Sequence, residues 1–303
     1  MVLAEIPNQL IDFPNHGVFL HIKREDTIHE FISGNKYRKL KYNILAAQES
    51  GAKRLLTFGG AYSNHIAAVA AAGKYYGFET IGVIRGEELA SEITQNPTLA
   101  FAAACGMQFQ FVSRSDYRQK DQTDFLEPLQ EKWGMAYVIP EGGTNILAVK
   151  GCEEILTDKD GDFDYICCAV GTGGTIAGLI NSSVMHQQVL GFPALKGEFL
   201  KEEIEKFAKN DRWMLVNDYH FGGYGKVTPE LIAFINDFYN QNKIPLDPIY
   251  TGKMVFGVID LITKGFFPKD SKILMIHTGG LQGIAGMNKK LQTKKLPILN
   301  VNA

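Results

Sequence analysis

Short apolar runs alternate with longer amphipathic or alanine-rich segments along most of the chain. In its first half, four apolar runs predict strands, and three segments with apolar residues three or four positions apart predict helices. The strands are expected at 54–58, 79–84, 109–112 and 136–140, and the helices at 64–76, 98–105 and 124–132. Strands that alternate with helices form parallel sheets through right-handed crossovers. This part of the chain is therefore predicted to form one α/β lobe.

The same alternation restarts near Asn145 and continues toward the end of the chain. It predicts strands at 164–170, 189–192, 213–216 and 273–276, joined by an early strand at 18–23, and helices at 146–156, 175–185, 201–209, 229–239 and 254–263. Two separate runs of alternating strands and helices imply two α/β lobes with a cleft between them. In α/β lobes, ligands bind beyond the carboxyl ends of the parallel strands. The loops that follow the strands are therefore where we look for chemistry.

Composition narrows the class of protein. The 303 residues are 45% hydrophobic and 21% charged, with a formal net charge of −2, as in an ordinary globular protein. This charge predicts neither a nucleic-acid nor a membrane partner. No run of 18 apolar residues exists, and the start of the chain, Met1–Pro7, lacks the basic segment of a secretory signal. The cytoplasm is the expected compartment.

The four cysteines, at positions 105, 152, 167 and 168, are not spaced as a zinc site, so no metal is expected. Three of them lie in apolar surroundings, which favours buried, reduced thiols.

The stretch Ser33–Tyr42 contains the first candidate for catalysis. Gly34 permits an unusual backbone angle, Asn35 is a good N-cap, and apolar residues then recur at helical spacing at 37, 40, 44 and 45. Lys36 is therefore predicted in the first turn of a helix, near the positive charges of residues 38, 39 and 41. A helix N-terminus and cationic neighbours both disfavour a protonated amine, and a lysine with a lowered pKa suits Schiff-base chemistry. The alternative is a basic helix start on a solvated surface, which is the interpretation we give to Lys39 and Lys41.

Two glycine turns follow predicted strands. The strand at 55–58 runs into Gly59-Gly60-Ala61-Tyr62-Ser63-Asn64-His65 and an alanine-rich helix, and the strand at 165–170 runs into Gly171-Thr172-Gly173-Gly174-Thr175. A glycine turn that opens a helix is typical of an anion site. The second turn lacks the dinucleotide-binding pattern, because Ile176 stands where a glycine is required, and it has no Walker pattern. Each turn could also be a plain helix start.

Together these stretches resemble fold-type II pyridoxal-phosphate (PLP) enzymes. The chain is most similar to the family of 1-aminocyclopropane-1-carboxylate (ACC) deaminase and D-cysteine desulfhydrase, on the motifs G-N-K-x-R-K-L and G-G-x-x-S-N-H. The resemblance extends from Ile22 to Gly280. It implies an α/β, tryptophan synthase β-like fold with two three-layer lobes and mostly parallel sheets. It also implies that residues 44–148 form a small domain inserted into a large one, 1–43 plus 149–303.

The resemblance implies roles for individual residues around the cofactor PLP. Lys36 is expected to hold PLP as a Schiff base and to take the substrate α-proton. The remaining cofactor contacts are expected from Asn64 at the 3-hydroxyl, from Gly171, Thr172, Gly173, Gly174 and Thr175 at the phosphate, from Thr251 at the pyridine nitrogen and from Thr278 near the ring. Substrate contacts are expected from Tyr62, Ser63, Asn64 and His65. Ser63, Tyr224 and Tyr250 are the other expected catalytic residues; the tyrosines flank the substrate, and one acts as acid or base if its pKa is lowered.

Three positions depart from the usual ACC deaminase pattern. Tyr62 replaces a glutamine, His65 is closer to the desulfhydrase pattern, and Thr251 replaces a glutamate in D-P-V-Y-E-G-K. A glutamate would keep the pyridine nitrogen protonated, whereas a threonine hydroxyl can donate a hydrogen bond to a neutral nitrogen. That favours elimination of a good leaving group over opening of the ACC ring. The alternative is that Thr251 only caps the following helix.

The resemblance therefore predicts a PLP-dependent lyase that acts on a small amino acid. D-cysteine, giving pyruvate, ammonia and hydrogen sulfide, is the preferred substrate. The alternatives are ACC deaminase, which yields 2-oxobutanoate and ammonia, other fold-type II activities such as racemisation, and a PLP-binding protein without catalysis. A homodimer is expected from the family.

Overall fold

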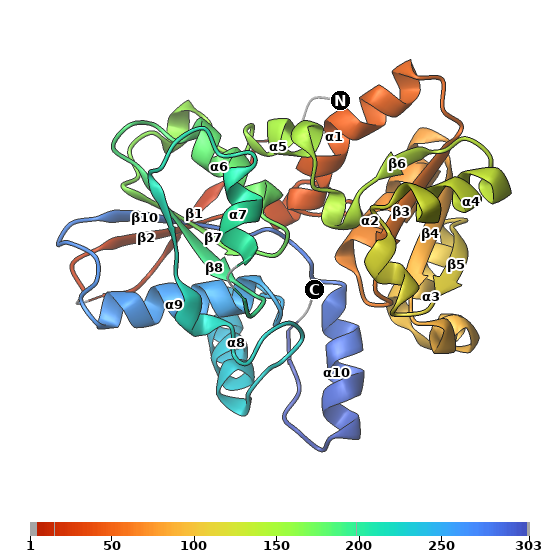
Figure 1. Cartoon of the computed structure of the whole chain (residues 1–303). Helices are drawn as coiled ribbons and strands as arrows, with labels where there is room; N and C mark the ends of the chain where they lie inside the picture. Colours follow the sequence, from red (N-terminus) through yellow and green to blue (C-terminus); the bar gives the residue numbers. More distant parts are fainter. Residues whose placement is uncertain (1–4, 15, 198, 302–303) are drawn as a thin grey trace.

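The computed structural model describes residues 5–14, 16–197 and 199–301, which form two α/β lobes side by side (Figure 1). The larger lobe contains a six-stranded sheet of order β1-β2-β10-β7-β8-β9, and the smaller one a four-stranded sheet of order β5-β4-β3-β6. The strands of the larger sheet are β1 (Asn8–Ile11), β2 (Phe19–Lys23), β7 (Tyr165–Val170), β8 (Gln188–Pro193), β9 (Trp213–Leu215) and β10 (Lys272–Ile276). Those of the smaller sheet are β3 (Arg54–Gly59), β4 (Glu79–Arg85), β5 (Gln108–Val112) and β6 (Tyr137–Ile139). All pairs are parallel except β1 with β2.

Helices separate most of these strands. The first four are α1 (Asn35–Glu49), α2 (Asn64–Tyr76), α3 (Pro97–Ala104) and α4 (Thr123–Trp133). The others are α5 (Ile146–Cys152), α6 (Gly174–Ser182), α7 (Phe199–Glu205), α8 (Pro229–Asn242), α9 (Thr251–Thr263) and α10 (Gly283–Thr293).

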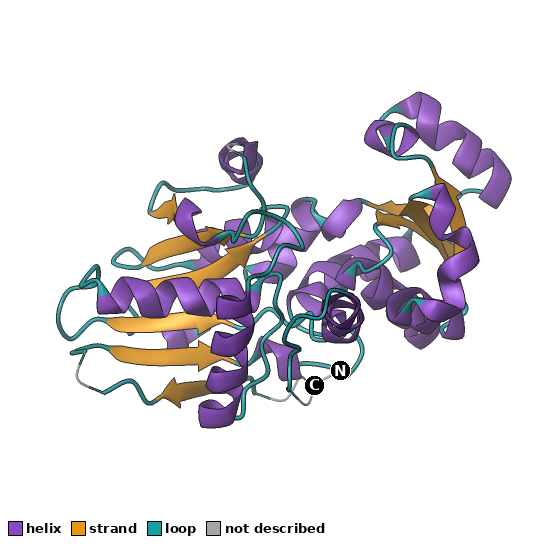
Figure 2. Cartoon of the chain, turned by 90° about the horizontal axis from the view of Figure 1, so that it is seen from below, coloured by secondary structure: helices purple, strands orange, loops and turns teal. Residues whose placement is uncertain are grey.

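Each sheet is covered by helices on both faces, because successive side chains of a strand point to opposite sides. In β7, Cys167 and Ala169 join a core with α8 and α9, whereas Ile166, Cys168 and Val170 join a second core with α6 and α7. Figure 2 shows helices lying over the strands of this lobe. Strands that are buried on both faces read as continuous apolar runs, which is why β7 was recognisable from its sequence.

The smaller lobe repeats this plan. Leu55 of β3 packs with α1, α2 and α3, whereas Leu56 and Phe58 pack on the other face with Leu129 of α4. The predicted fold class, two three-layer α/β lobes with mostly parallel sheets, is therefore confirmed.

Among the strands and α-helices of the described residues, β1 and α10 were not predicted from the sequence. The strand β1 is only four residues long, and its pairing with β2 defines it. The helix α10 contains two glycines, Gly283 and Gly286, and its pattern is correspondingly weak. In addition, α9 begins at Thr251, earlier than predicted, and α5 ends at Cys152 rather than near 156.

The helices α1 and α5 lie against each other where the lobes meet (Figure 1). Their backbones approach so closely that a Cβ added to Gly151 would lie 1.9 Å from the carbonyl oxygen of Arg38. The predicted boundaries, 43/44 and 148/149, fall inside these two helices. All four strands of the smaller sheet lie between the boundaries, but the exact division into domains stays a prediction.

Within the described ranges, no helix combines the length and the apolar character needed to cross a membrane. All four cysteines are free thiols, and three of them are buried, as predicted.

Candidate active site

Lys36 lies in the first turn of α1, and this turn is pressed against the end of β10. Gly34, the N-cap of α1, has φ 61°, and a Cβ added to it would lie 2.0 Å from the carbonyl oxygen of Thr278. Only glycine fits there. Asn35 is not the N-cap that the sequence suggested: its backbone N–H donates to that same oxygen of Thr278 (3.2 Å), and its side-chain Nδ2 donates to Oγ1 of Thr175 (2.8 Å). This second bond ties the start of α1 to the start of α6.

The amine of Lys36 has a pKa close to neutral pH. The side chain keeps some exposed surface, but its amine is buried, and its one hydrogen-bond contact within the described residues is a long one, 3.4 Å, with Oδ1 of Asn35. Burial, and secondly the positive charge of Lys39, lower the pKa of Lys36 from 10.5 to about 7. The predicted lowering is confirmed, although desolvation, which the sequence argument did not include, is its largest cause. A neutral amine is a nucleophile and a base.

The glycine turn after β7 leaves the start of α6 without a cap. Gly173, the N-cap, has φ 83° and no capping side chain. Within the described chain, no hydrogen bond is found for the backbone N–H groups of Gly174 and Thr175. Unpaired N–H groups at the N-terminus of a helix attract an anion.

Lys39 lies beside this turn, contrary to our expectation of a solvated position. It is 2% exposed, and its Nζ contacts the carbonyl oxygen of Gly142 (3.0 Å), Oγ1 of Thr144 (2.9 Å) and Oγ1 of Thr172 (3.3 Å). All three acceptors are neutral, and burial lowers the pKa of Lys39. By contrast, Lys41 is partly exposed and pairs with Glu154 (2.6 Å). A buried ammonium without a counter-ion is costly, so a bound anion would stabilise Lys39.

The glycine turn after β3 differs, because its helix is capped. Oγ of Ser63 accepts hydrogen bonds from the backbone N–H groups of His65 (3.2 Å) and Ile66 (3.3 Å). Next to it, Oδ1 of Asn64 accepts a hydrogen bond from Nε2 of Gln282 (2.8 Å), which immediately precedes α10. Nothing in the sequence marked Gln282. Since neither the hydroxyl hydrogen of Ser63 nor Nδ2 of Asn64 has an acceptor among the described residues, the turn presents both as donors.

His65 is buried at the start of α2. It is 2% exposed, and its Nε2 lies 2.8 Å from Oγ1 of Thr57, whose own hydrogen goes to the carbonyl oxygen of Ile139. Thr57 can therefore only accept from His65, which places the hydrogen of the imidazole on Nε2. Burial and the charges of the nearby lysines lower the pKa of His65 well below 6.5. With Nε2 bonded to Thr57, the neutral imidazole supports the turn, and a substrate contact of His65 stays a prediction.

Tyr62 is 43% exposed and lies over α10. A Cβ added to Gly286 would lie 2.5 Å from its ring, so a glycine is required opposite Tyr62. A substrate contact of Tyr62 stays a prediction.

Tyr224 and Tyr250 lie edge to face, with ring centroids 6.2 Å apart. Tyr250 covers the turn after β7, since a Cβ added to Gly171 would lie 3.1 Å from its ring. Burial raises the pKa of Tyr224, and it raises the pKa of Tyr250 well above 10. The lowered pKa that would let one of them act as a base is therefore not found. Both phenols stay protonated and can donate hydrogen bonds.

The hydroxyl of Thr251 is committed to Asp247. Thr251 is completely buried, and its Oγ1 donates to Oδ2 of Asp247 (2.6 Å). The same carboxylate accepts from the backbone N–H groups of Thr251 (2.8 Å), Tyr250 (2.8 Å) and Ile249 (2.9 Å). Asp247 thus caps the start of α9.

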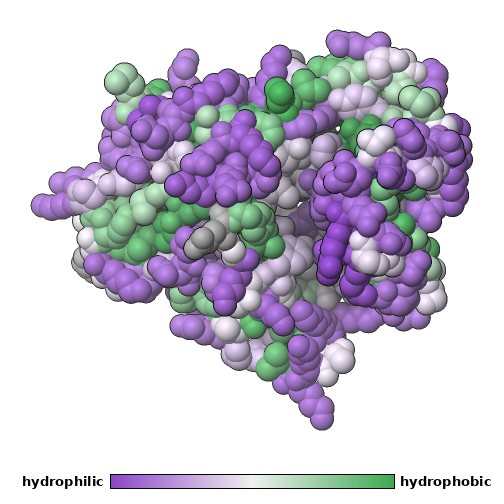
Figure 3. Space-filling model, viewed as in Figure 1, coloured by the Kyte–Doolittle hydropathy of each residue, from purple (hydrophilic) through white to green (hydrophobic). Residues whose placement is uncertain are grey.

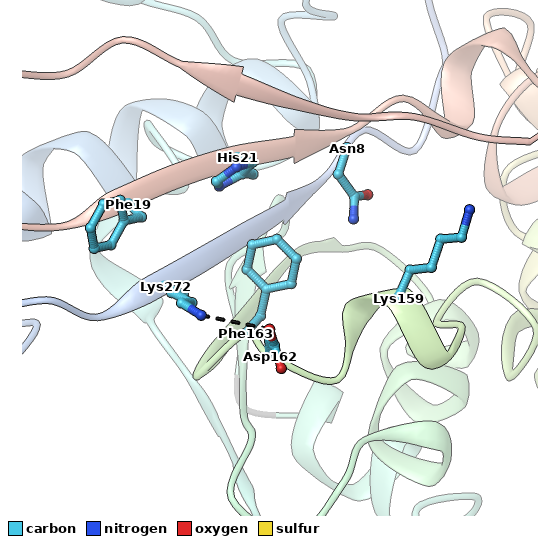
Figure 4. A pocket seen from close by; sticks show the side chains of 7 residues that line it. All are labelled: Asn8, Phe19, His21, Lys159, Asp162, Phe163 and Lys272. Atoms are coloured by element: carbon cyan, nitrogen blue, oxygen red, sulfur yellow. Dashed lines mark ion pairs between the residues drawn. The ribbon is translucent and has the colours of Figure 1, made fainter.

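Figure 3 shows a hollow between the two lobes on this face of the molecule. A different hollow, of about 360 Å³, lies at the far end of the larger sheet (Figure 4). It includes Phe19 and Lys272, the first residues of β2 and β10, and His21 and Phe163. Since Lys36 and both turns lie at the carboxyl ends of the strands, the cleft between the lobes is the candidate active site.

Comparison with known proteins decides the family. A model of the pyridoxal-phosphate-dependent enzymes matches residues 2–279. This chain belongs to that family.

Similar proteins show to which PLP enzymes this chain is related. A Pyrococcus horikoshii protein, provisionally named an ACC deaminase, is 33% identical and covers 91% of this chain and 88% of its own. The bifunctional D-cysteine desulfhydrase/ACC deaminase of Arabidopsis thaliana mitochondria is 32% identical and covers 93% of this chain and 78% of its own. A solved structure described as an ACC deaminase homologue has a TM-score of 0.83 at 32% identity and covers 96% of this chain and 94% of its own. The predicted membership in the ACC deaminase and D-cysteine desulfhydrase family and the fold-type II architecture are confirmed.

The site of this PLP enzyme fits its cofactor. The uncapped start of α6 and the buried ammonium of Lys39 suit a phosphate dianion. The amine of Lys36 suits the cofactor aldehyde. Thr278, which is 7% exposed, lies close to Lys36 in the fold, because its backbone packs against Gly34 at the start of the same helix. When bound, PLP supplies an electron sink for negative charge that develops at the substrate Cα. Sequence reasoning missed Lys39, although its spacing of three from Lys36 places both on one side of α1.

One expectation about the PLP ring is not met. A hydrogen bond from Thr251 to a neutral pyridine nitrogen needs the hydrogen that Thr251 gives to Asp247. The alternative interpretation, a role at the start of α9, is the one that the geometry supports, with Asp247 as its partner.

Proposed function

We propose that this PLP enzyme removes the Cβ substituent of a small amino acid and deaminates it, with D-cysteine as the substrate. The observation that carries the proposal is the near-neutral amine of Lys36, held between an uncapped turn that suits a phosphate and a capped turn that suits a carboxylate. The name of the Arabidopsis relative, which includes D-cysteine desulfhydrase, supports this substrate.

In this proposal the cofactor contacts are those expected from the sequence at Lys36, Asn64 and 171–175, with Lys39 added at the phosphate. The free amine of Lys36 takes the α-proton, because its pKa near 7 leaves it neutral in part at neutral pH. The Cβ–S bond breaks with its electron pair on sulfur. D-cysteine and one water give pyruvate, ammonia and hydrogen sulfide, which accounts for all atoms.

In this proposal, the positions of the substrate groups follow from the helix start at Ser63 and from the two tyrosines. The α-carboxylate suits the N-terminus of α2, beside Ser63. The protonated phenols of Tyr224 and Tyr250 act as hydrogen-bond donors. This division keeps Ser63, Tyr224 and Tyr250 as catalytic candidates and drops Thr251.

ACC is the second candidate substrate, because the Pyrococcus relative and the solved homologue carry the ACC deaminase name. Against it stands the absence of a carboxylate at position 251. We also propose a homodimer, which light scattering of the PLP-loaded protein tests; a monomer mass would contradict it.

The test is release of 2-oxo acids from D-cysteine and from ACC in parallel, with chromatographic separation of pyruvate from 2-oxobutanoate. Pyruvate and sulfide from D-cysteine, with no 2-oxobutanoate from ACC, are expected. Release of 2-oxobutanoate as the main product would instead assign the ACC deaminase activity. If neither acid forms, the proposal fails, and a PLP-binding protein without this catalysis becomes the better account.

A further inference from the structure

Arg85 is the last residue of β4 and lies at the edge of the cleft. Because β4 is parallel to β3, with Ile84 opposite Gly59, Arg85 comes level with the glycine turn that leads to Ser63. A Cβ added to Gly60 would lie 3.7 Å from Nη2 of Arg85. The guanidinium therefore lies over the turn that faces the substrate.

The positive charge of Arg85 has no acidic partner in the described residues. Its guanidinium contacts the ring of Tyr117, 5.6 Å from the ring centroid, and forms no ion pair with any residue that the structure describes. The nearby carboxylate of Glu141 is engaged by the hydroxyl of Tyr117 (2.8 Å) and by Lys120 (3.4 Å). By contrast, Arg114, which follows the neighbouring strand β5, is paired with Glu88.

Arg85 also acts on the opposite wall of the cleft. Its charge works to lower the pKa of Tyr224, although burial raises that pKa overall. Tyr224 belongs to the larger lobe and Arg85 to the smaller one, so the charge of Arg85 acts across the boundary between the lobes. Hydrophilic side chains border the hollow on the side of the smaller lobe (Figure 3).

We propose that Arg85 selects the substrate by binding negative charge on its Cβ substituent. The α-carboxylate already has a place at the N-terminus of α2. The positive charge of Arg85 is therefore available for a second anionic group of the substrate. This inference rests on the proposed function and names its substrate class: amino acids whose side chain is anionic or leaves as an anion. Loss of thiolate from D-cysteine meets this condition, since the electron pair of the Cβ–S bond departs on sulfur. Opening of the ACC ring expels no such anion.

The test measures binding without turnover. Aspartate and asparagine are nearly isosteric, differ in side-chain charge and have no leaving group at Cβ. Each is titrated, in both enantiomeric forms, into the PLP-loaded protein, and the change in cofactor absorbance gives the dissociation constant. The unmodified protein is expected to bind one enantiomer of aspartate about tenfold more tightly than the matching asparagine. In Arg85→Gln this preference is expected to disappear, whereas the control Arg114→Gln keeps it.

Three results would overturn the proposal. One is a preference for aspartate that survives in Arg85→Gln, and another is the absence of any preference or of any binding in the unmodified protein. The third is an equal loss of both ligands in Arg85→Gln, which would assign Arg85 to the α-carboxylate. Thermal unfolding of both variants checks that they are folded. Because no product is formed, failure here leaves the test on D-cysteine and ACC intact, and the two proposals fail separately.

Discussion

The two glycine turns of this enzyme look alike in sequence but differ in two respects. After β3, Oγ of Ser63 caps α2, whereas after β7 none of the described side chains caps α6. The first turn has an exposed neighbour, Arg85, and the second has a buried one, Lys39. A permanently bound dianion needs unpaired N–H groups and a fixed cation, while a substrate that comes and goes is better served by a turn that is stable without it. The presence or absence of a capping side chain therefore distinguishes the substrate turn from the cofactor turn.

The largest effect is expected where the two turns converge. Changing Lys36 to Ala removes the amine that faces both, so turnover should fall at least about a thousandfold and the absorbance of protein-bound PLP should change. Assays of 2-oxo acid release and absorption spectra measure this. Lys41→Ala, a change on the partly exposed part of α1, should keep both properties. Full activity in Lys36→Ala would remove the basis of the account.

The next effect concerns the cation of the cofactor turn. In Lys39→Met the phosphate loses its charged donor, and the dissociation constant for PLP should rise about 10- to 100-fold. Titration of the cofactor-free protein measures it, with Lys41→Met as the matched control. An unchanged affinity would mean that Lys39 does not contact the phosphate.

The same pair of lysines predicts a pH dependence. Below the pKa of Lys36, about 7, its protonated fraction grows, so the rate of PLP uptake should fall about tenfold per pH unit and should level off above pH 7. Because the charge of Lys39 lowers this pKa, the midpoint should move to higher pH in Lys39→Met. Stopped-flow absorbance gives the profile. A flat profile between pH 5 and 8 would contradict the lowered pKa.

Substitutions at two glycines distinguish the effect of backbone strain from an effect on phosphate binding. Gly173 in the cofactor turn has φ 83°, and Gly77 at the end of α2 has φ 79° with nothing within 4 Å of an added Cβ. Replacement by Ala should cost each about 1 kcal/mol of unfolding free energy. Only Gly173→Ala should also weaken PLP binding. Equal PLP affinity in both variants would show that the conformation of Gly173 does not serve the phosphate.

The smallest effect on PLP is expected at the substrate turn. Ser63→Ala removes the cap of α2 and should lower the unfolding free energy by about 1 kcal/mol, while PLP affinity stays the same. Ser63→Thr should restore the stability. If turnover returns with it, capping is the role of Ser63; if turnover stays low in a stable Ser63→Thr, the hydroxyl acts on the substrate. Loss of PLP from Ser63→Ala would erase the difference between the turns.

The sequence predicted those features that depend on local order. The bounds predicted for α2, 64–76, are those of the structure, because a cap, an alanine-rich run and Gly77 define it locally. Lys36 and both turns were found for the same reason. The short strand β1 was missed, because only its pairing with β2 makes it a strand.

Features that depend on tertiary contacts were missed or misassigned. Lys39 reads like Lys41, and only the packing of α1 against the turn after β7 buries it. The hydrogen bond that Gln282 donates to Asn64 joins residues 218 positions apart. The pair of Asp247 and Thr251 was within reach of the sequence, since an aspartate just before a helix commonly caps it. It was missed because only Thr251 was considered there, either as the partner of the pyridine nitrogen or as the cap itself, and Asp247 was not.

The most direct test of the division between the two lysines is to locate the cofactor. Reduction of the PLP-loaded protein with borohydride fixes the pyridoxyl group on the lysine that carries it, and peptide mass spectrometry then identifies that residue. Lys36 and Lys39 are separated within one peptide by fragmentation. The account predicts the pyridoxyl group on Lys36 and an unmodified Lys39. Modification of Lys39 in place of Lys36 would contradict it.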